Sequence, residues 1–202
     1  MRKSDGRIPA AIGFTVKSGW ASVVLLTGPA ASPRVVNSCR VELSDPAIAG
    51  SRQPYHAGFG TARHAGPDLS QLVAGVKRFG RKSVSEVIRQ YQSGEHLVHG
   101  AGVVVGSLID PTSIANDHIR THALEGQLFR GVVQDAASRT NVPSKVWRER
   151  DLYASAADVL ERPEHTLRAE LKAMGAELAG SWRAEQKLAA LAAWLVLARG
   201  PW

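Results

Sequence analysis

Hydrophobic positions over the first 43 residues fall into three short runs. Residues 11–17, 20–26 and 34–43 are rich in aliphatic and β-branched side chains. Ser18-Gly19 separates the first two runs, and a Gly-, Pro- and Ser-rich stretch at 27–33 separates the second from the third. Short apolar runs bounded by turn residues are typical of strands. The pattern therefore predicts an antiparallel meander of three strands.

The next segment changes from strand-like to helical periodicity. Residues 44–67 are rich in Gly, Pro, Ala and His, which predicts a long loop of a kind that is often functional. A helical pattern follows from Asp68 to Phe79, with the aspartate as its cap. The Gly80-Arg81-Lys82 sequence predicts an interruption, and a second helical pattern runs from 83 to 92.

The longest apolar run before the C-terminal region spans residues 97–109 and is nearly continuous. Such a run is typical of a central strand covered on both faces. A helix is expected after it, a short strand at 142–146, and helices from Pro163 onward with a break at Gly180-Ser181. This order predicts a three-layer α/β fold: a mixed sheet, made of the meander plus buried strands, with helices on both faces.

The helix expected after this strand carries unusual polar residues on its apolar face. His118, His122 and Glu125 are spaced i, i+4, i+7, so they share one face of a helix. Further along the chain the same face is apolar, through Phe129, Val132 and Ala136. Polar groups in such a position must be paired, bound to a metal, or directed into a cleft.

Three interpretations of this trio stay open. Histidines four apart on a helix can share a metal, and two imidazoles with one carboxylate suit zinc or Fe(II) better than magnesium. Residues 119–121 lack the glutamate of the zinc-protease motif, which argues against that class. The trio is also compatible with acid–base chemistry or anion binding in a cleft, or with a buried His–Glu hydrogen-bond network. Its position after a buried strand favours a cleft.

Other candidate residues are more isolated. Glu185 lies in the first turn of the last predicted helix, on a face that continues as apolar. It is either a metal ligand or general base, or a carboxylate favoured there by the helix dipole. Asp110 is expected to be a turn residue before a proline. In the long loop, His56 and His64 are either part of a lid or solvated.

Composition adds a basic charge to this picture. The chain has 202 residues, 44% of them hydrophobic and 21% charged, with a net charge of +7. These values fit one globular domain spanning 1–202, and the charge is compatible with a nucleic-acid partner or with solubility alone. A basic cluster surrounds Phe79 and is either a phosphate-contacting element or a solvated helix end. It consists of Lys77, Arg78, Arg81 and Lys82.

Several classes are disfavoured. The only cysteine, Cys39, rules out an intrachain disulfide and a thiolate-rich zinc site. The apolar run at 188–198 is about half as long as a membrane span needs, and no cleavable signal is evident. We therefore expect a cytoplasmic protein without a membrane segment, and the sequence leaves its oligomeric state open. No glycine-rich phosphate loop and no serine-nucleophile motif occurs, so ATPase and serine-hydrolase activities have no support.

Two segments resemble a known family. Gly13-Phe14-Thr15 followed by Gly19-Trp20-Ala21 is similar to the first strand pair of the ribonuclease-H-like superfamily, especially its Holliday-junction-resolvase type. The Ala/Leu-rich segment at 181–197, which includes Glu185, resembles its last helix. The resemblance implies this fold, together with a nuclease site in which several carboxylates hold two divalent metals about 4 Å apart.

The sequence departs from that family at the implied site. Thr15 stands where the first-strand aspartate is expected. The end of the buried strand reads Gly106-Ser107, and only Glu185 stands where the family places an acid. The resemblance then predicts a degenerate member that acts in nucleic-acid metabolism by binding rather than by two-metal cleavage. Two alternatives remain: a hydrolase or nuclease with a rebuilt site of His118, His122, Glu125 and Glu185, or a structural, partner-binding module. The cofactor is left open, a divalent metal being one option.

Overall fold

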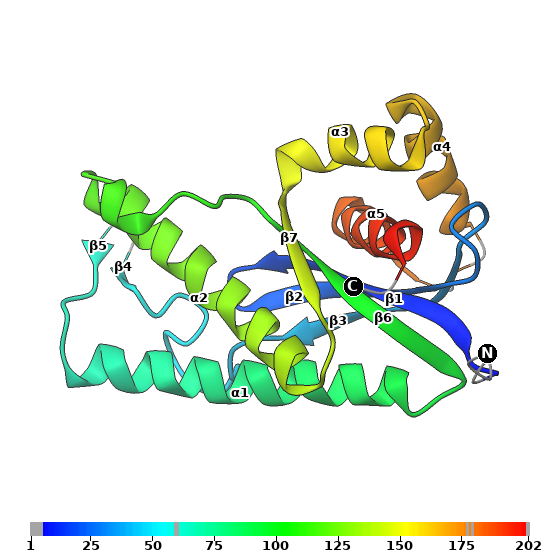
Figure 1. Ribbon diagram of the computed structural model, residues 1–202. Coiled ribbons are helices and arrows are strands. Elements are labelled where there is room, and N and C mark those ends of the chain that lie inside the picture. Colours follow the sequence, from blue (N-terminus) through cyan, green and yellow to red (C-terminus); the bar gives the residue numbers. More distant parts are fainter. Residues whose placement is uncertain (1–5, 59–60, 177, 179, 201–202) are drawn as a thin grey trace.

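The computed structural model describes residues 6–58, 61–176, 178 and 180–200. Its centre is a mixed five-stranded sheet with the order β3-β2-β1-β6-β7. The first three strands form the predicted antiparallel meander, and β6 and β7 join it in parallel with β1 (Figure 1). The strands are β1 (Ile8–Lys17), β2 (Trp20–Thr27), β3 (Arg34–Glu42), β6 (His96–Val105) and β7 (Ser144–Arg148).

Helices cover both faces of this sheet, as the sequence predicted (Figure 1). The long helices α1 (Pro67–Gln92) and α2 (Asp117–Arg139) pack on one face. The other face is covered by α5 (Ala184–Arg199), with α3 (Glu149–Leu160) and α4 (Glu164–Met174) beyond it. A small hairpin, β4 (His56–Gly58) and β5 (Thr61–Ala62), lies in the long loop before α1, and a short 3-10 turn, Pro111–Ser113, precedes α2.

The two faces of β1 belong to two separate hydrophobic cores. Ile12, Phe14 and Val16 are buried in the core under α1 and α2. Ala11 is buried in the core under α5, and because side chains alternate along a strand, Gly13 and Thr15 also face α5. This alternation decides which candidate residues can meet and which cannot.

Two glycines let α5 lie directly on the sheet. Gly13 of β1 and Gly102 of β6 are partners in the parallel register. A Cβ atom on Gly13 would lie 1.7 Å from the carbonyl oxygen of Ala189, and one on Gly102 would lie 2.6 Å from that of Ala192. The helix backbone therefore occupies the space that side chains would fill. Because of this close approach, residues 188–197 of α5 are buried all round.

The predicted interruption at residues 80–82 is wrong, because α1 is continuous from Pro67 to Gln92. Gly80 suggested a break, but here it serves packing. A Cβ atom at Gly80 would lie 2.6 Å from the Leu43 carbonyl oxygen and 2.7 Å from a methyl group of Val132. A glycine inside a helix costs roughly 1 kcal/mol against alanine. At this position that cost is offset by the close approach of α1 to α2 and to the end of the meander.

Other boundaries differ by several residues. The buried strand ends at Val105 rather than 109, and residues 106–110 form an exposed connection. Helix α4 ends at Met174, before the predicted break at 180–181. The segment from 149 to 160 was not expected to be helical. Its two acidic residues, Glu149 and Asp151, lie in the first turn of α3, where the helix dipole favours negative charge.

A membrane-crossing helix was not expected, and none of the helices in the described part of the chain has the length and apolar character to cross a bilayer.

Candidate functional site

The predicted polar face of α2 begins at a well-defined helix start. The side chain of Asn116 caps α2 by accepting a hydrogen bond from the backbone N–H of Ile119, at 3.0 Å. This start fixes His118 and His122 one turn apart, with their Nε2 atoms 3.3 Å from each other. Both imidazoles are exposed, whereas Glu125, one turn further on, is fully buried.

The rest of the predicted face is confirmed. Phe129, Val132 and Ala136 are buried in the core between α2 and the sheet. The histidines are exposed because the first turns of α2 extend past the sheet to the region of β4 and β5 (Figure 1). Within the polar part of this face, His118 and His122 are thus exposed, whereas Glu125 is buried.

A third histidine completes the group. His56, at the start of β4, lies with its ring centroid 4.7 Å from that of His122 and 5.8 Å from that of His118. Its Nδ1 atom forms a 2.8 Å hydrogen bond with Oε1 of Glu125. The side chain of His56 is 10% exposed and that of Glu125 is 1% exposed. The structure thus contains a His–Glu hydrogen bond, but Glu125 forms it with His56 rather than with His118 or His122, and it joins α2 to the long loop rather than to the sheet.

Backbone hydrogen bonds hold His56 in place. The guanidinium of Arg63 donates to the carbonyl oxygens of Pro54 and His56, at 3.0 and 3.2 Å. The backbone N–H of Arg63 also donates to the carbonyl oxygen of Tyr55, at 2.7 Å. The chain on both sides of the β4–β5 turn is thus tied together, which positions the imidazole against α2.

Burial sets the electrostatics of this group. It raises the pKa of Glu125, although the hydrogen bond and charge of His56 act in the opposite direction. Burial also lowers the pKa of His122, and the nearby His56 and His118 lower it further. The second carboxylate oxygen of Glu125, Oε2, is buried and has no hydrogen-bond partner among the described residues. His56 thus interacts electrostatically with both Glu125 and His122.

The histidine group borders a cleft of about 340 Å³ at the carboxyl ends of β1 and β6. This is the position at which open α/β sheets bind ligands. The polar groups on its wall are Lys17, Ser18, Ser107 and His122, and the remaining lining is mostly apolar. The prediction that the histidine helix faces a cleft therefore holds for His122.

The structure separates Glu185 from the histidine group. Glu185 starts α5 on the opposite face of the sheet, where its backbone carbonyl oxygen accepts a hydrogen bond of 2.8 Å from Oγ1 of Thr15. The last helix, α5, thus starts beside Thr15, the residue that stands where the resemblance places the first-strand aspartate. It does not bring its carboxylate to His118 and His122. Glu185 and the histidine group therefore do not form one site.

Asp110 has the turn role expected of it. Its side chain accepts a hydrogen bond from the backbone N–H of Thr112 at 2.9 Å, and bonds to Thr112 lower its pKa. The carboxylate is exposed and caps the short turn before α2.

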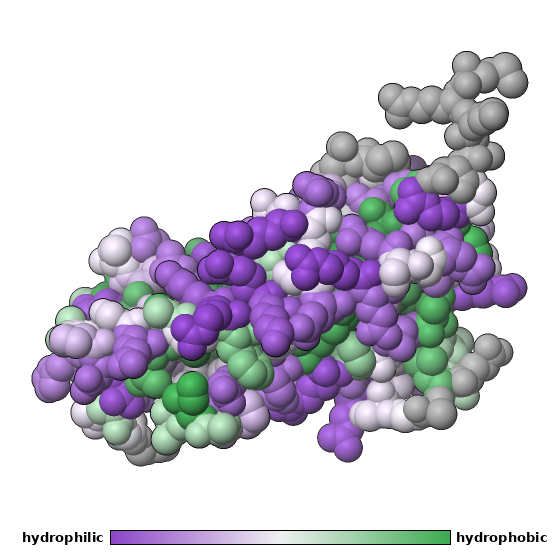
Figure 2. Space-filling view, turned by 90° about the horizontal axis from the view of Figure 1, so that it is seen from below, coloured by the Kyte–Doolittle hydropathy of each residue, from purple (hydrophilic) through white to green (hydrophobic). Residues whose placement is uncertain are grey.

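Part of the basic cluster on α1 takes part in ion pairs. Arg81 forms an ion pair with Asp135 of α2 at 2.7 Å, and Lys82 lies 3.9 Å from Glu86. Lys77 and Arg78 are exposed. Figure 2, seen from below with α1 toward the viewer, shows a mostly hydrophilic surface on this side.

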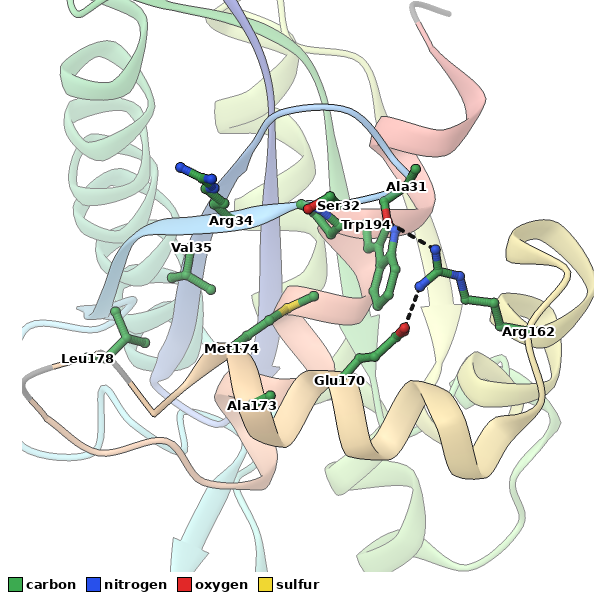
Figure 3. A pocket seen from close by; sticks show the side chains of 11 residues that line it. Ala31, Ser32, Arg34, Val35, Arg162, Glu170, Ala173, Met174, Leu178 and Trp194 are labelled. Atoms are coloured by element: carbon green, nitrogen blue, oxygen red, sulfur yellow. Dashed lines mark hydrogen bonds and ion pairs between the residues drawn. The ribbon is translucent and has the colours of Figure 1, made fainter.

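A larger cavity, of about 690 Å³, lies between the loop after β2 and helices α4 and α5 (Figure 3). Because β2 runs antiparallel to β1, this cavity is at the other end of the sheet from the cleft. Three charged side chains line it, those of Arg34, Arg162 and Glu170, and the last two form an ion pair at 2.5 Å. Arg162 also donates to the carbonyl oxygen of Ala31 at 3.0 Å. Arg162 and Glu170 are thus engaged with each other and with the loop after β2.

These features are enough to assign the class of fold. A meander followed by two parallel strands, with helices on both faces and a cleft at the strand ends, is the ribonuclease-H-like fold of the Holliday-junction-resolvase type. No protein-family model matches the sequence, and no curated protein matches it significantly.

Particular solved structures share this fold. The chain is similar to Thermus thermophilus RuvC bound to a Holliday junction substrate, with 13% identity, a TM-score of 0.54 and 94% of each chain covered. It is also similar to another structure of T. thermophilus RuvC, with 13% identity, a TM-score of 0.53, and 92% of this chain and 91% of that one covered. The yeast mitochondrial resolvase Ydc2 aligns at 8% identity with a TM-score of 0.48, over 94% of this chain and 80% of that one. At 13% identity, the likeness to the two RuvC structures shows the fold.

Sequence reasoning singled out His118, His122 and Glu125 but left His56 among the loop residues. The only signal for His56 was a histidine in an unusually long loop. Its hydrogen bond to Glu125 joins residues 69 positions apart, and no local pattern reports such a contact. Lys17 was also not singled out, although it lies on the wall of the cleft.

Proposed function

We propose that this chain acts in nucleic-acid metabolism by binding branched nucleic acid, and that it does not cleave by the two-metal route of its fold class. The observation that carries the proposal is the extent of the fold match. RuvC with a Holliday junction substrate aligns over 94% of both chains. The net charge of +7 supports an anionic partner.

The residues at the expected metal position do not fit a pair of divalent cations. Thr15 is 1% exposed, and its hydroxyl is already bonded to a backbone carbonyl. A neutral hydroxyl is a weak substitute for a carboxylate as a ligand for a doubly charged, hard cation. The carboxylate of Glu149, at the start of α3, is in an ion pair with Lys17 at 3.1 Å. Lys17 lies two residues after Thr15 on the same strand and repels a cation, and none of the described residues that line the cleft beside it is acidic.

The exposed bases of α1 give the proposal a contact surface. Lys77 and Arg78 are free of the ion pairs that engage Arg81 and Lys82. We assign phosphate contacts to Lys77 and Arg78, and a partly structural role to Arg81 and Lys82. Each phosphate contact releases counterions, so it contributes about 0.9 to the slope of log affinity against log salt concentration.

The test is a binding titration of the full chain against four-way junction, duplex and single-stranded DNA over a salt series, with chelator present. We expect the junction to bind most tightly and affinity to fall steeply with salt. A double variant, Lys77→Gln with Arg78→Gln, should reduce the salt slope by about 2.

The control is Lys172→Gln with Arg199→Gln, which removes the same charge from exposed positions on α4 and α5. It should leave the slope close to that of the wild type. Absence of binding to every substrate at low salt would refute the proposal. Metal-dependent junction cleavage by the wild type would refute its second half.

A further inference from the structure

The histidine group has the geometry of a metal site. Among the described residues, one set of three histidine, cysteine or acidic side chains gathers closely enough to share an ion: His56, His118 and His122. One ligand atom from each lies within 4.8 Å of the other two. No fourth side chain of these types joins the set within the described ranges.

The separation of the two helical histidines matches a coordination edge. In a tetrahedral zinc site with nitrogens about 2.0–2.1 Å from the ion, neighbouring nitrogens are about 3.3–3.4 Å apart. The Nε2 atoms of His118 and His122 are 3.3 Å apart. This separation already equals the edge length, and the separations to the third ligand atom, which are at most 4.8 Å, must shorten by at most about 1.5 Å.

Glu125 prepares the third ligand. Because a carboxylate can only accept a hydrogen bond, Glu125 favours the tautomer of His56 that carries its proton on Nδ1, and Nε2 is then the atom that can ligate a metal. A carboxylate behind a ligating histidine is the usual second shell of zinc sites. A bound cation would also give the buried charge of Glu125 a counter-charge. This matters because Oε2 of Glu125 is buried and lacks a hydrogen-bond partner among the described residues.

We infer that His56, His118 and His122 bind one transition-metal ion, with Glu125 orienting His56 from behind. Three neutral imidazoles favour Zn²⁺ or Fe²⁺ over Mg²⁺. Because His118 and His122 are exposed, the remaining coordination position opens to solvent and lies beside the cleft. It is free to take water or an anionic oxygen. The inference is independent of nucleic-acid binding, which is measured with chelator present.

The test uses the full chain, stripped of metal and then titrated with Co²⁺ and with Zn²⁺. We expect one Co²⁺ per chain, with the intense visible absorption of a four-coordinate ion, and its displacement by one Zn²⁺. Mg²⁺ should not compete. Thermal melting with and without Zn²⁺ gives a second readout, since a ligand that binds the folded state raises the melting temperature.

Matched variants locate the site. His118→Gln and His122→Gln alter exposed side chains, so both should fold, and each should weaken Zn²⁺ binding at least tenfold. His64→Gln, a substitution of an exposed histidine in the same loop, should change nothing. Glu125→Gln should keep the stoichiometry but weaken the affinity about 10–100-fold. Absence of a stoichiometric site in the wild type would overturn the inference. So would Zn²⁺ binding that survives in the His118→Gln/His122→Gln double variant.

Discussion

Replacement of Gly13 by alanine tests whether the fold depends on direct contact between α5 and the sheet. The new Cβ would lie 1.7 Å from the Ala189 carbonyl oxygen and 3.1 Å from the Ala193 backbone nitrogen. Ordinary contacts begin near 3.4 Å, so α5 must move by about 1.7 Å. The obstacle is helix backbone, which cannot turn aside as a side chain can.

The expected cost follows from this overlap. Overpacking a core by one methyl group costs about 1–3 kcal/mol and occasionally more. A clash with backbone belongs at the upper end, because a shift of α5 also disturbs the buried Trp194 and its 2.7 Å hydrogen bond to Ala30. Alanine recovers only about 0.5–1 kcal/mol from the lower entropy of the unfolded chain. We therefore expect Gly13→Ala to lose at least about 3 kcal/mol of unfolding free energy, or about 6–12 °C in melting temperature.

Two further alanines make the test quantitative. Gly102→Ala should cost less, about 1–3 kcal/mol, because its Cβ meets the Ala192 carbonyl at 2.6 Å. Gly131→Ala is the control: this glycine lies in α2 with nothing within 4 Å of a Cβ, so the change should stabilise by about 1 kcal/mol. Urea denaturation followed by circular dichroism measures all three. A Gly13→Ala protein within 1 kcal/mol of the wild type would refute the close-packing argument.

Three more substitutions or reactions test local features. Thr15→Val should cost about 1 kcal/mol, because it removes the hydroxyl that donates to the Glu185 carbonyl; an unchanged urea midpoint would contradict this role. Asn116→Ala should cost about 1 kcal/mol through the lost cap of α2, and the same denaturation assay would expose an effect near zero. Burial raises the pKa of the Cys39 thiol, so iodoacetamide should react with it much more slowly at pH 8 in the folded protein than in urea; equal rates would show that the thiol is open to solvent.

The order of elements followed closely from the sequence because it rests on local signals. Strands β1, β2 and β3 begin and end within three residues of the predicted bounds, because turn residues flank each apolar run. The errors arose where a local signal has two uses. Gly80 was interpreted as a helix break, yet in the structure its missing side chain admits neighbouring backbone and Val132. A glycine that breaks a helix and one that lets two helices approach look alike until the neighbour is known.

The candidate site was half predictable for the same physical reason. His118, His122 and Glu125 lie on one helix, so a period of 3.6 residues places them together whatever the rest of the chain does. His56 reaches them only because the long loop folds back over the start of α2, and Arg63 fixes that path through two backbone carbonyls. Glu185 shows the converse. The helical pattern predicted that its side chain faces the protein interior, but the pattern cannot tell which face of the sheet the helix covers. Periodicity thus finds the residues of one element, whereas a site built from several elements depends on tertiary packing.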